Sequence, residues 1–223
     1  ARRSGAPEDL LQVVIGAREV GDALVDDSRV PLVSATGSTR MGAEVGPRVA
    51  ARFGRTVLEL GGNNVAIVLP GADVDLAASA GATGSFFHQG QICMSTGRHI
   101  VHQDVHDEYV DRLVARAEAL AVGDPSTEQV HLGPIIDEKQ LKNIDSVVQG
   151  SLTAGAVART GADHDGLFYR PTVLTDVTPD MPATVIAERI GWAYGITILK
   201  DRIRELRPLY LPPDPSGRTQ YLA

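Results

Sequence analysis

The sequence predicts an α/β protein built on a parallel sheet, and two features of its N-terminal part predict this class. Short apolar runs of strand length alternate with stretches whose apolar residues recur at helical spacing, and polar or glycine-containing turns separate them. Strands are expected at residues 10–15, 30–34 and 56–60, and helices at residues 18–25 and 37–53. Because strand and helix alternate in this order, we expect each strand to lie parallel to the next.

The stretch Gly61-Gly62-Asn63-Asn64 interrupts this alternation and is expected to be a hinge between two domains. We therefore divide the chain into residues 1–61, residues 62–182 and a divergent tail, residues 183–223. In the second part, strands are expected at residues 65–69, 98–102 and 168–174, and helices at residues 74–86, from the N-cap Asp104 to Gly123, and at residues 138–151.

Composition and charge exclude several classes of function. The 223 residues are 43% hydrophobic and carry a formal net charge of −7, so no global positive field exists to hold nucleic acid or an anionic membrane. The apolar runs are far shorter than the roughly 20 residues that span a bilayer, and the N-terminus is not expected to be a secretory signal. A single cysteine fits a reducing compartment, so we expect a cytoplasmic protein.

Gly37-Ser38-Thr39 lies between a predicted strand and a predicted helix. Free backbone N–H groups at such a place favour an anion or the polar edge of a cofactor. A simple Ser/Thr helix cap is the alternative explanation. The stretch matches neither the G-x-G-x-x-G fingerprint nor a Walker A loop.

Cys93 and Glu59 are the candidates for covalent and general-base chemistry. Cys93 follows Gly90-Gln91 in a predicted loop, where its thiol could attack a carbonyl carbon and its backbone N–H could face the resulting oxyanion. A lone cysteine that is simply a small buried hydrophobe is the alternative. Glu59 stands between two leucines and is expected to be buried, which suits a general base, whereas an exposed strand-end carboxylate is the alternative.

Two longer stretches resemble signatures of the aldehyde dehydrogenase superfamily. Residues 59–63, Glu-Leu-Gly-Gly-Asn, are similar to its glutamate signature, and residues 87–93, Phe-His-Gln-Gly-Gln-Ile-Cys, are similar to its cysteine signature. Their separation of 34 residues (93 minus 59) also agrees with the family. Residues 37–39 are similar to the stretch that meets the nicotinamide end of the cofactor, and the landmarks at residues 123–125 and 132–136 match as well.

This resemblance covers residues 7–182 and implies a partial aldehyde dehydrogenase fold, the remnant of a Rossmann-like cofactor domain followed by an α/β catalytic domain. It implies oxidation of an aldehyde to the carboxylic acid with NAD or NADP. Cys93 would form a thiohemiacetal and then a thioester, and Glu59 would activate the hydrolytic water. The residues implied to bind the cofactor are Gly37, Ser38, Leu60 and Gly61. Residues 88–99 look most like the benzaldehyde and vanillin dehydrogenase branch, which points to aromatic aldehydes.

The chain departs from the family pattern at both ends. The family's second oxyanion donor, an asparagine, and the lysine that holds the adenine ribose lie upstream of the region matched by Pro7, and Arg189 stands where the family has a ribose-binding glutamate. We therefore expect an incomplete copy that lacks N-terminal and C-terminal parts, has little activity alone and forms at most a weakened homo-oligomer. The alternatives are a cysteine-dependent esterase and an inactive partner of a full-length homologue.

No metal ion is expected. His102 and His106 are four residues apart, but no third ligand is evident, and we expect both side chains at the surface.

Overall fold

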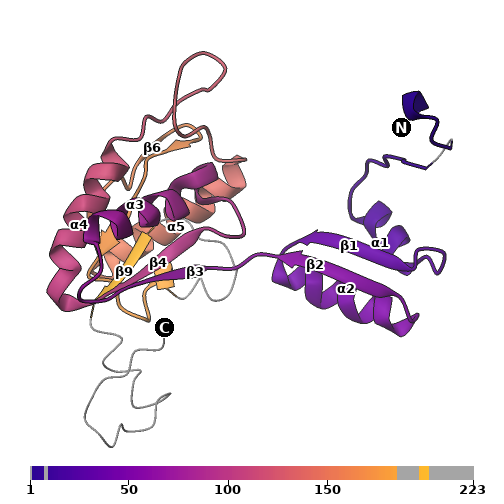
Figure 1. Cartoon of the computed structure of the whole chain (residues 1–223), viewed down its shortest axis with the longest axis horizontal. Helices are drawn as coiled ribbons and strands as arrows, with labels where there is room; N and C mark the ends of the chain where they lie inside the picture. The colour runs from indigo at the N-terminus through magenta and orange to yellow at the C-terminus, as the bar shows by residue number, and fades with distance from the viewer. Residues whose placement is uncertain (1, 8–9, 185–195, 201–223) are drawn as a thin grey trace, which may run out of the picture. The chain divides into compact units, whose positions relative to one another are not determined.

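The computed structural model describes residues 2–7, 10–184 and 196–200 (Figure 1). The chain divides into two compact units, Ala1–Leu60 and Gly61–Ala223. Each unit has its own sheet and its own buried cluster of side chains. The sequence-based division after Gly61 lies one residue from this boundary, and the cofactor and catalytic roles assigned to the two parts stay predictions.

The first unit contains a two-stranded parallel sheet and two α-helices. Its elements are η1 (Arg2–Ser4), α1 (Arg18–Asp26), β1 (Leu32–Gly37), α2 (Thr39–Ala51) and β2 (Arg55–Leu60). The two strands pair in register from Leu32 opposite Arg55 to Gly37 opposite Leu60, so they end at the same edge of the sheet. The sequence predicted both helices and both strands, although β1 begins two residues later than expected and continues to Gly37.

The helices of the first unit pack on alternate residues of its strands. Val25, Val45 and Val49 form the buried cluster, and Val33 and Leu58 pack against it from the sheet. Arg48 of α2 also pairs with Asp22 and Asp26 of α1, which ties the two helices together at their exposed faces. The period-two burial of both strands is typical of a sheet with one covered face.

Residues 10–15 form no strand, so the sequence prediction was wrong there. Their side chains are exposed: Leu11 is 79% exposed and Ile15 is 92% exposed. A strand needs a hydrogen-bonded neighbour, and within the described residues β1 and β2 pair only with each other. An apolar run of strand length does not by itself reveal whether such a neighbour exists.

The second unit is built on a five-stranded sheet with the strand order β3-β4-β9-β8-β5. Its strands are β3 (Asn64–Val68), β4 (Thr96–Val101), β5 (Val157–Thr160), β8 (Val173–Thr175) and β9 (Ile196–Lys200), with a small hairpin of β6 (His164–Asp165) and β7 (Phe168–Tyr169). Its helices are α3 (Val74–Phe86), η2 (Phe87–Gly90), α4 (Gln103–Glu118) and α5 (Glu138–Thr153). Within the described five-stranded sheet, β5 runs antiparallel to β8, and the other neighbouring strands are parallel.

The main core of the second unit lies where α3 and α4 pack together and against the sheet (Figure 1). Tyr109, Val110 and Leu113 of α4 are fully buried, which confirms the amphipathic pattern predicted for this helix. The helix begins two residues earlier than expected, because His102, and not Asp104, caps it by accepting a hydrogen bond from the backbone N–H of Asp104. His106 is buried rather than at the surface, which corrects our expectation for this side chain.

The single strand predicted at residues 168–174 is two short strands, β7 and β8. Pro171 lies between them and has no N–H to donate to a ladder, so the pairing breaks at this point. The sequence analysis also missed β5 and β6, which are short and mostly exposed. No helix in the described part of the chain is both long and apolar enough to cross a membrane.

Part of the predicted tail belongs to the main sheet. Ala183 packs beside α5 and β8, the Thr184 carbonyl accepts a hydrogen bond from Arg98 of β4, and β9 lies between β4 and β8. The expectations for Arg189 and for residues 201–223 lie outside the described residues.

Candidate active site

Cys93 lies on a loop that joins α3 to β4, here called the Cys93 loop (residues 87–95). After Phe87, three consecutive residues of the loop adopt the left-handed region, His88, Gln89 and Gly90, with φ of 51°, 55° and 68°. For a residue with a Cβ atom this conformation costs roughly 1–2 kcal/mol, so it persists only where the surroundings fix it. The loop therefore depends on contacts to the rest of the unit.

Two glutamines attach the first half of the loop to the segment before α5. The Gln91 side-chain oxygen accepts a hydrogen bond from the backbone N–H of Ile136 at 3.1 Å. Oriented with its oxygen toward Gly133, the Gln89 amide accepts from the backbone N–H of that residue at 2.8 Å. These contacts explain in physical terms why glutamines stand on both sides of Gly90.

The second half of the loop is held by Asn64 and Ser95. Asn64 of β3 donates from its side chain to the Cys93 carbonyl at 3.4 Å and from its backbone to the Ser95 carbonyl at 3.3 Å. Ser95 is fully buried, and its hydroxyl accepts from the backbone N–H of Ile92 at 3.4 Å. The carbonyl side of Cys93 is thus fixed by the neighbouring strand.

Cys93 itself is a free, exposed cysteine, so the buried-hydrophobe alternative is wrong. Within the part of the chain that the structure describes, no group accepts a hydrogen bond from its backbone N–H. An exposed thiol beside an unused N–H donor on a fixed turn can attack a carbonyl carbon and stabilise the oxyanion that forms.

In the first unit, four of the residues expected to act on the cofactor or the substrate lie at one edge of the sheet. Gly37 is opposite Leu60, and Glu59 is opposite Thr36, because β1 and β2 are parallel and in register. Ser38 follows directly and caps α2 by accepting from the backbone N–H of Met41 at 3.2 Å. Gly61, the remaining residue implied to bind the cofactor, begins the second unit.

This edge can accept the polar part of a dinucleotide. An α-helix leaves its first N–H groups without intrahelical acceptors, and Ser38 satisfies only that of Met41. The Leu60 side chain packs on α2, where a Cβ atom on Gly42 would stand 2.9 Å from Leu60 Cδ2. Because Leu60 is used for packing, its backbone is the part left for a ligand. The helix-cap explanation and the cofactor explanation of Ser38 are therefore compatible.

Glu59 is exposed on β2, so the burial that we expected for it was wrong and the alternative, an exposed carboxylate at a strand end, is observed. Alternate residues of β2 face α2, and Glu59 belongs to the opposite set. Its role as a general base stays a prediction.

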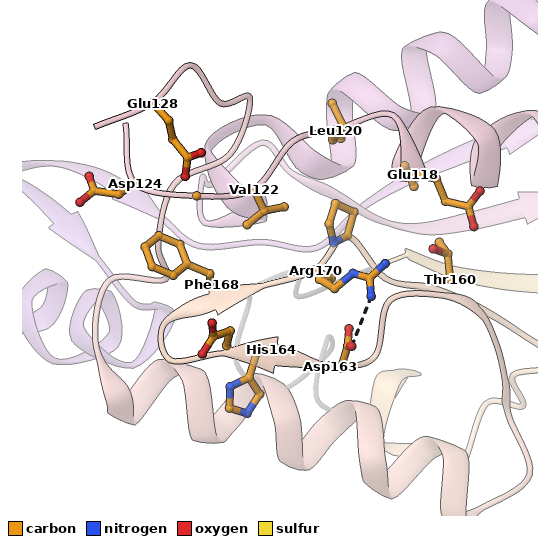
Figure 2. A pocket seen from close by; sticks show the side chains of 14 residues that line it. Glu118, Leu120, Val122, Asp124, Glu128, Thr160, Asp163, His164, Phe168 and Arg170 are labelled. Atoms are coloured by element: carbon orange, nitrogen blue, oxygen red, sulfur yellow. Dashed lines mark hydrogen bonds and ion pairs between the residues drawn. The ribbon is translucent and has the colours of Figure 1, made fainter. Parts of the chain in front are cut away.

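A separate cavity of about 560 Å³ lies between the end of α4, the loop that follows it and the β6–β7 hairpin (Figure 2). Figure 2 shows Phe168 and Arg170 in the middle of its lining, and Arg170 pairs with Asp163 at 3.3 Å. Neither Cys93 nor any residue of its loop lines this cavity, so we assign no catalytic step to it. Among the residues that the structure describes, no three metal-ligating side chains are grouped so that they could hold a metal ion. His102 and His106 therefore belong to no such group.

The sequence analysis missed the residues that support Cys93. Asn64 was noted only as part of a hinge, and Ser95 and His99 only as letters of a signature. Their contacts join strands and helices that are far apart in the sequence, and no local pattern reports such contacts.

Comparison with known proteins agrees with this geometry. The profile of the aldehyde dehydrogenase family matches residues 1–186. Vanillin dehydrogenase from an Amycolatopsis species is 52% identical over 180 residues, which are 81% of this chain and 37% of that protein. The NAD(+) benzaldehyde dehydrogenase of Pseudomonas putida is 44% identical over 178 residues, 80% of this chain and 37% of that protein.

Among solved structures, the succinate-semialdehyde dehydrogenase of Burkholderia pseudomallei superimposes with a TM-score of 0.84 and 34% identity. The match covers 94% of this chain and 44% of that chain. The sequence therefore spans less than half the length of these relatives.

Proposed function

Because the chain belongs to the aldehyde dehydrogenase family, we propose that it carries the nucleophile, the deacylating base and part of the cofactor site of an NAD(P)-dependent aldehyde dehydrogenase. The observation that carries this proposal is the Cys93 loop, in which an exposed thiol stands on a strained turn held by Gln91 and Asn64. A single cysteine in the chain fits the reducing compartment of the cytoplasm.

In the first step, the Cys93 thiolate adds to the aldehyde carbon. A carbon–sulfur bond forms, and the carbonyl electron pair moves to oxygen, which the Cys93 backbone N–H stabilises. Asn64 supports this geometry because it holds the Cys93 carbonyl and so fixes the peptide plane on the other side of the residue. The product on the enzyme is a thiohemiacetal.

Gly37, Ser38, Leu60 and Gly61 would hold the cofactor, and the first turn of α2 offers N–H groups to its polar part. When bound, NAD or NADP would supply the hydride acceptor, and the carbon attached to Cys93 would lose its hydride to leave a thioester on this cysteine. A side chain at position 37 would have to displace Met41, because a Cβ atom on Gly37 would stand 2.7 Å from the methyl carbon of that residue.

Glu59 would complete the reaction. Its carboxylate takes a proton from water, the resulting hydroxide adds to the thioester carbon, and the carbon–sulfur bond breaks. The acid leaves and Cys93 returns to its thiolate form. The position of Glu59 supports this role, because Glu59, Leu60 and Gly37 all lie at the C-terminal ends of the paired strands β1 and β2.

We further propose an aromatic aldehyde as the substrate. Residues 88–99 resemble the benzaldehyde and vanillin dehydrogenase branch, and two of the similar proteins carry those names.

The test is oxidation of benzaldehyde and vanillin by the purified chain with NAD or NADP, followed by the absorbance of the reduced cofactor. Because we expect the chain to have little activity alone, we expect low turnover that disappears in Cys93→Ala and persists in a surface control such as Lys142→Ala. A folded chain that oxidises neither aldehyde, or a Cys93→Ala variant as active as the wild type, would contradict the proposal.

A second candidate function is a cysteine-dependent esterase. It is favoured by one observation: among the described residues, the hydrogen bonds from Asn64, Gln89 and Gln91 hold the Cys93 loop within the second unit, so acylation of Cys93 does not depend on β1 and β2 of the first unit. Steady hydrolysis of an activated aryl ester without NAD or NADP, lost in Cys93→Ala, would support this activity.

Association with a further chain is a third candidate. Residues 10–15 expose an apolar run, and β1 and β2 pair only with each other among the described residues. Co-purification in a mixed oligomer with a full-length homologue, lost when Val13 and Ile15 are replaced by Lys, would support it.

A further inference from the structure

Three buried polar side chains, here called the His99 network, connect α3, β4 and α4. His99 of β4 lies at its centre and is fully buried. Its Nδ1 atom is 2.6 Å from the Tyr109 hydroxyl oxygen, and its Nε2 atom is 3.0 Å from the Ser85 hydroxyl oxygen and 3.2 Å from the Thr96 carbonyl oxygen. Ser85 also donates to the Thr96 carbonyl at 2.5 Å.

Only one arrangement of protons satisfies all of these contacts. The Ser85 hydroxyl hydrogen is used by the Thr96 carbonyl, so the Ser85 oxygen must accept from His99. His99 therefore carries its proton on Nε2, and its Nδ1 accepts from the Tyr109 hydroxyl. Burial lowers the pKa of His99 to about 4, which keeps the ring neutral and the arrangement intact near neutral pH.

The network is also closely packed. Gly81 of α3 faces it, and a Cβ atom there would stand 2.9 Å from His99 Cε1 and in collision with the Tyr109 hydroxyl. The absence of a side chain at Gly81 is what allows Tyr109 to reach His99. The three side chains consequently have little room to take other positions.

The network lies across the two ends of the Cys93 loop. Ser85 is in the last turn of α3, two residues before the loop begins, and Thr96 directly follows its last residue. The hydrogen bond from Ser85 to Thr96 joins these ends, and His99 and Tyr109 hold Ser85 in the position that makes it. A loop that contains left-handed His88 and Gln89 would relax if its ends were released.

We propose that Ser85, His99 and Tyr109 are positioning residues for the reaction of Cys93, because they fix the ends of its loop in the conformation in which the thiol and its own backbone N–H act together on a carbonyl group. The proposal rests on the proposed function, since it concerns the reactivity of the same cysteine. None of the three residues touches the reacting atoms.

The test compares two reactions of Cys93 in the full chain. Cys93 is the only cysteine in the sequence, so both reactions report this thiol. Acylation by an activated aryl ester passes through an oxyanion and needs the loop geometry, whereas alkylation by iodoacetamide forms no oxyanion. In Ser85→Ala we expect acylation at least about 10-fold slower, with alkylation within about 2-fold of the wild type. Backbone amides of residues 87–95 should exchange hydrogen at least about 10-fold faster.

Ser151→Ala is the matched control. Ser151 is also a fully buried serine near a helix end, with its hydroxyl bonded to the Val147 carbonyl, but it has no contact with the Cys93 loop. We expect Ser151→Ala to lower the stability of the chain while the ratio of the acylation rate to the alkylation rate stays as in the wild type. Tyr109→Phe removes a single oxygen from the network, and it is the second test variant in case Ser85→Ala does not fold. We expect Tyr109→Phe also to slow acylation more than alkylation, but by a smaller factor than Ser85→Ala.

Acylation and alkylation that fall together, or unchanged rates with unchanged amide exchange in both network variants, would overturn the positioning role. Failure of the proposed function looks different: the wild-type Cys93 would be alkylated by iodoacetamide but never acylated by the ester.

Discussion

The Nδ1 atom of His99 lies 2.6 Å from the hydroxyl oxygen of Tyr109, and neither residue is exposed to solvent. Burial also raises the pKa of the Tyr109 hydroxyl, so both groups stay neutral near neutral pH. This neutral pair joins α4 to β4, and His99 also contacts Thr96, the residue that follows the Cys93 loop. The stability of the second unit and the behaviour of the loop are therefore linked.

The folded chain should lose stability in mild acid because of His99. Its pKa is lowered from the ordinary 6.5 to about 4, so the unfolded chain takes up the proton first as the pH falls. The stabilising contribution is complete above pH 6.5 and is lost progressively down to pH 4. Between pH 7 and 5.5, where most carboxylates remain ionised, we expect a loss of about 1 kcal/mol from this group.

The measurement is urea unfolding followed by near-ultraviolet circular dichroism. Every tyrosine and the tryptophan lie beyond Gly61 in the sequence, so the signal reports the second unit. His99→Gln should unfold with a smaller dependence on pH than the wild type. An equal dependence in both proteins would show that His99 does not titrate in this way.

Gly81→Ala should destabilise the second unit by about 1–3 kcal/mol, because the added methyl group would collide with Tyr109 and His99. Combination with Tyr109→Phe should recover part of that loss, since the colliding oxygen is then gone. Thermal unfolding of the single and double variants measures the coupling. Gly21→Ala is the control, because that helical glycine has open space around it and the change should be neutral or stabilising.

Gln91→Ala should slow acylation of Cys93 by an aryl ester at least about 5-fold, because the hydrogen bond to the Ile136 N–H holds the turn before the cysteine. Gln91→Glu keeps an acceptor oxygen at the same place and should retain most of the rate. If both variants acylate as fast as the wild type, the contact with Ile136 does not position the loop.

Glu59→Gln should separate the two halves of the reaction. Acylation by the ester should proceed as in the wild type, while hydrolysis of the acyl group slows at least about 10-fold for lack of a general base. In the time course of phenol release, we expect a fast burst from acylation followed by a slow phase that is limited by hydrolysis of the acyl group. Equal steady rates in both proteins would assign the base to another residue. Glu44→Gln, an exposed glutamate of α2, is the control.

Elements with a strong local pattern were predicted from the sequence. The small-residue stretch of α3 gave that helix with its observed bounds, and the apolar spacing of α4 gave a helix whose end was placed several residues too late. The alternation of strand and helix gave the parallel pair β1 and β2. These features depend on neighbouring residues in the chain, which a sequence displays directly.

Features that depend on distant partners were not predicted. Residues 10–15 have the composition of a strand but no hydrogen-bonded neighbour, and β9 joins the sheet from a region whose pattern gave no signal. The site shows the same contrast. Cys93 and its glutamines form one continuous signature, whereas Ser85, His99 and Tyr109 meet only after α3, β4 and α4 have packed.

The most direct measurement of the central claim is the mass of Cys93 after the Glu59→Gln chain is mixed with benzaldehyde and NAD or NADP. We predict that the peptide containing Cys93 gains a benzoyl group, formed only when an oxidised cofactor is present and absent in Cys93→Ala. An unmodified Cys93 in a folded chain, or a benzoyl group on any other residue, would contradict the claim that this thiol carries the aldehyde through its oxidation.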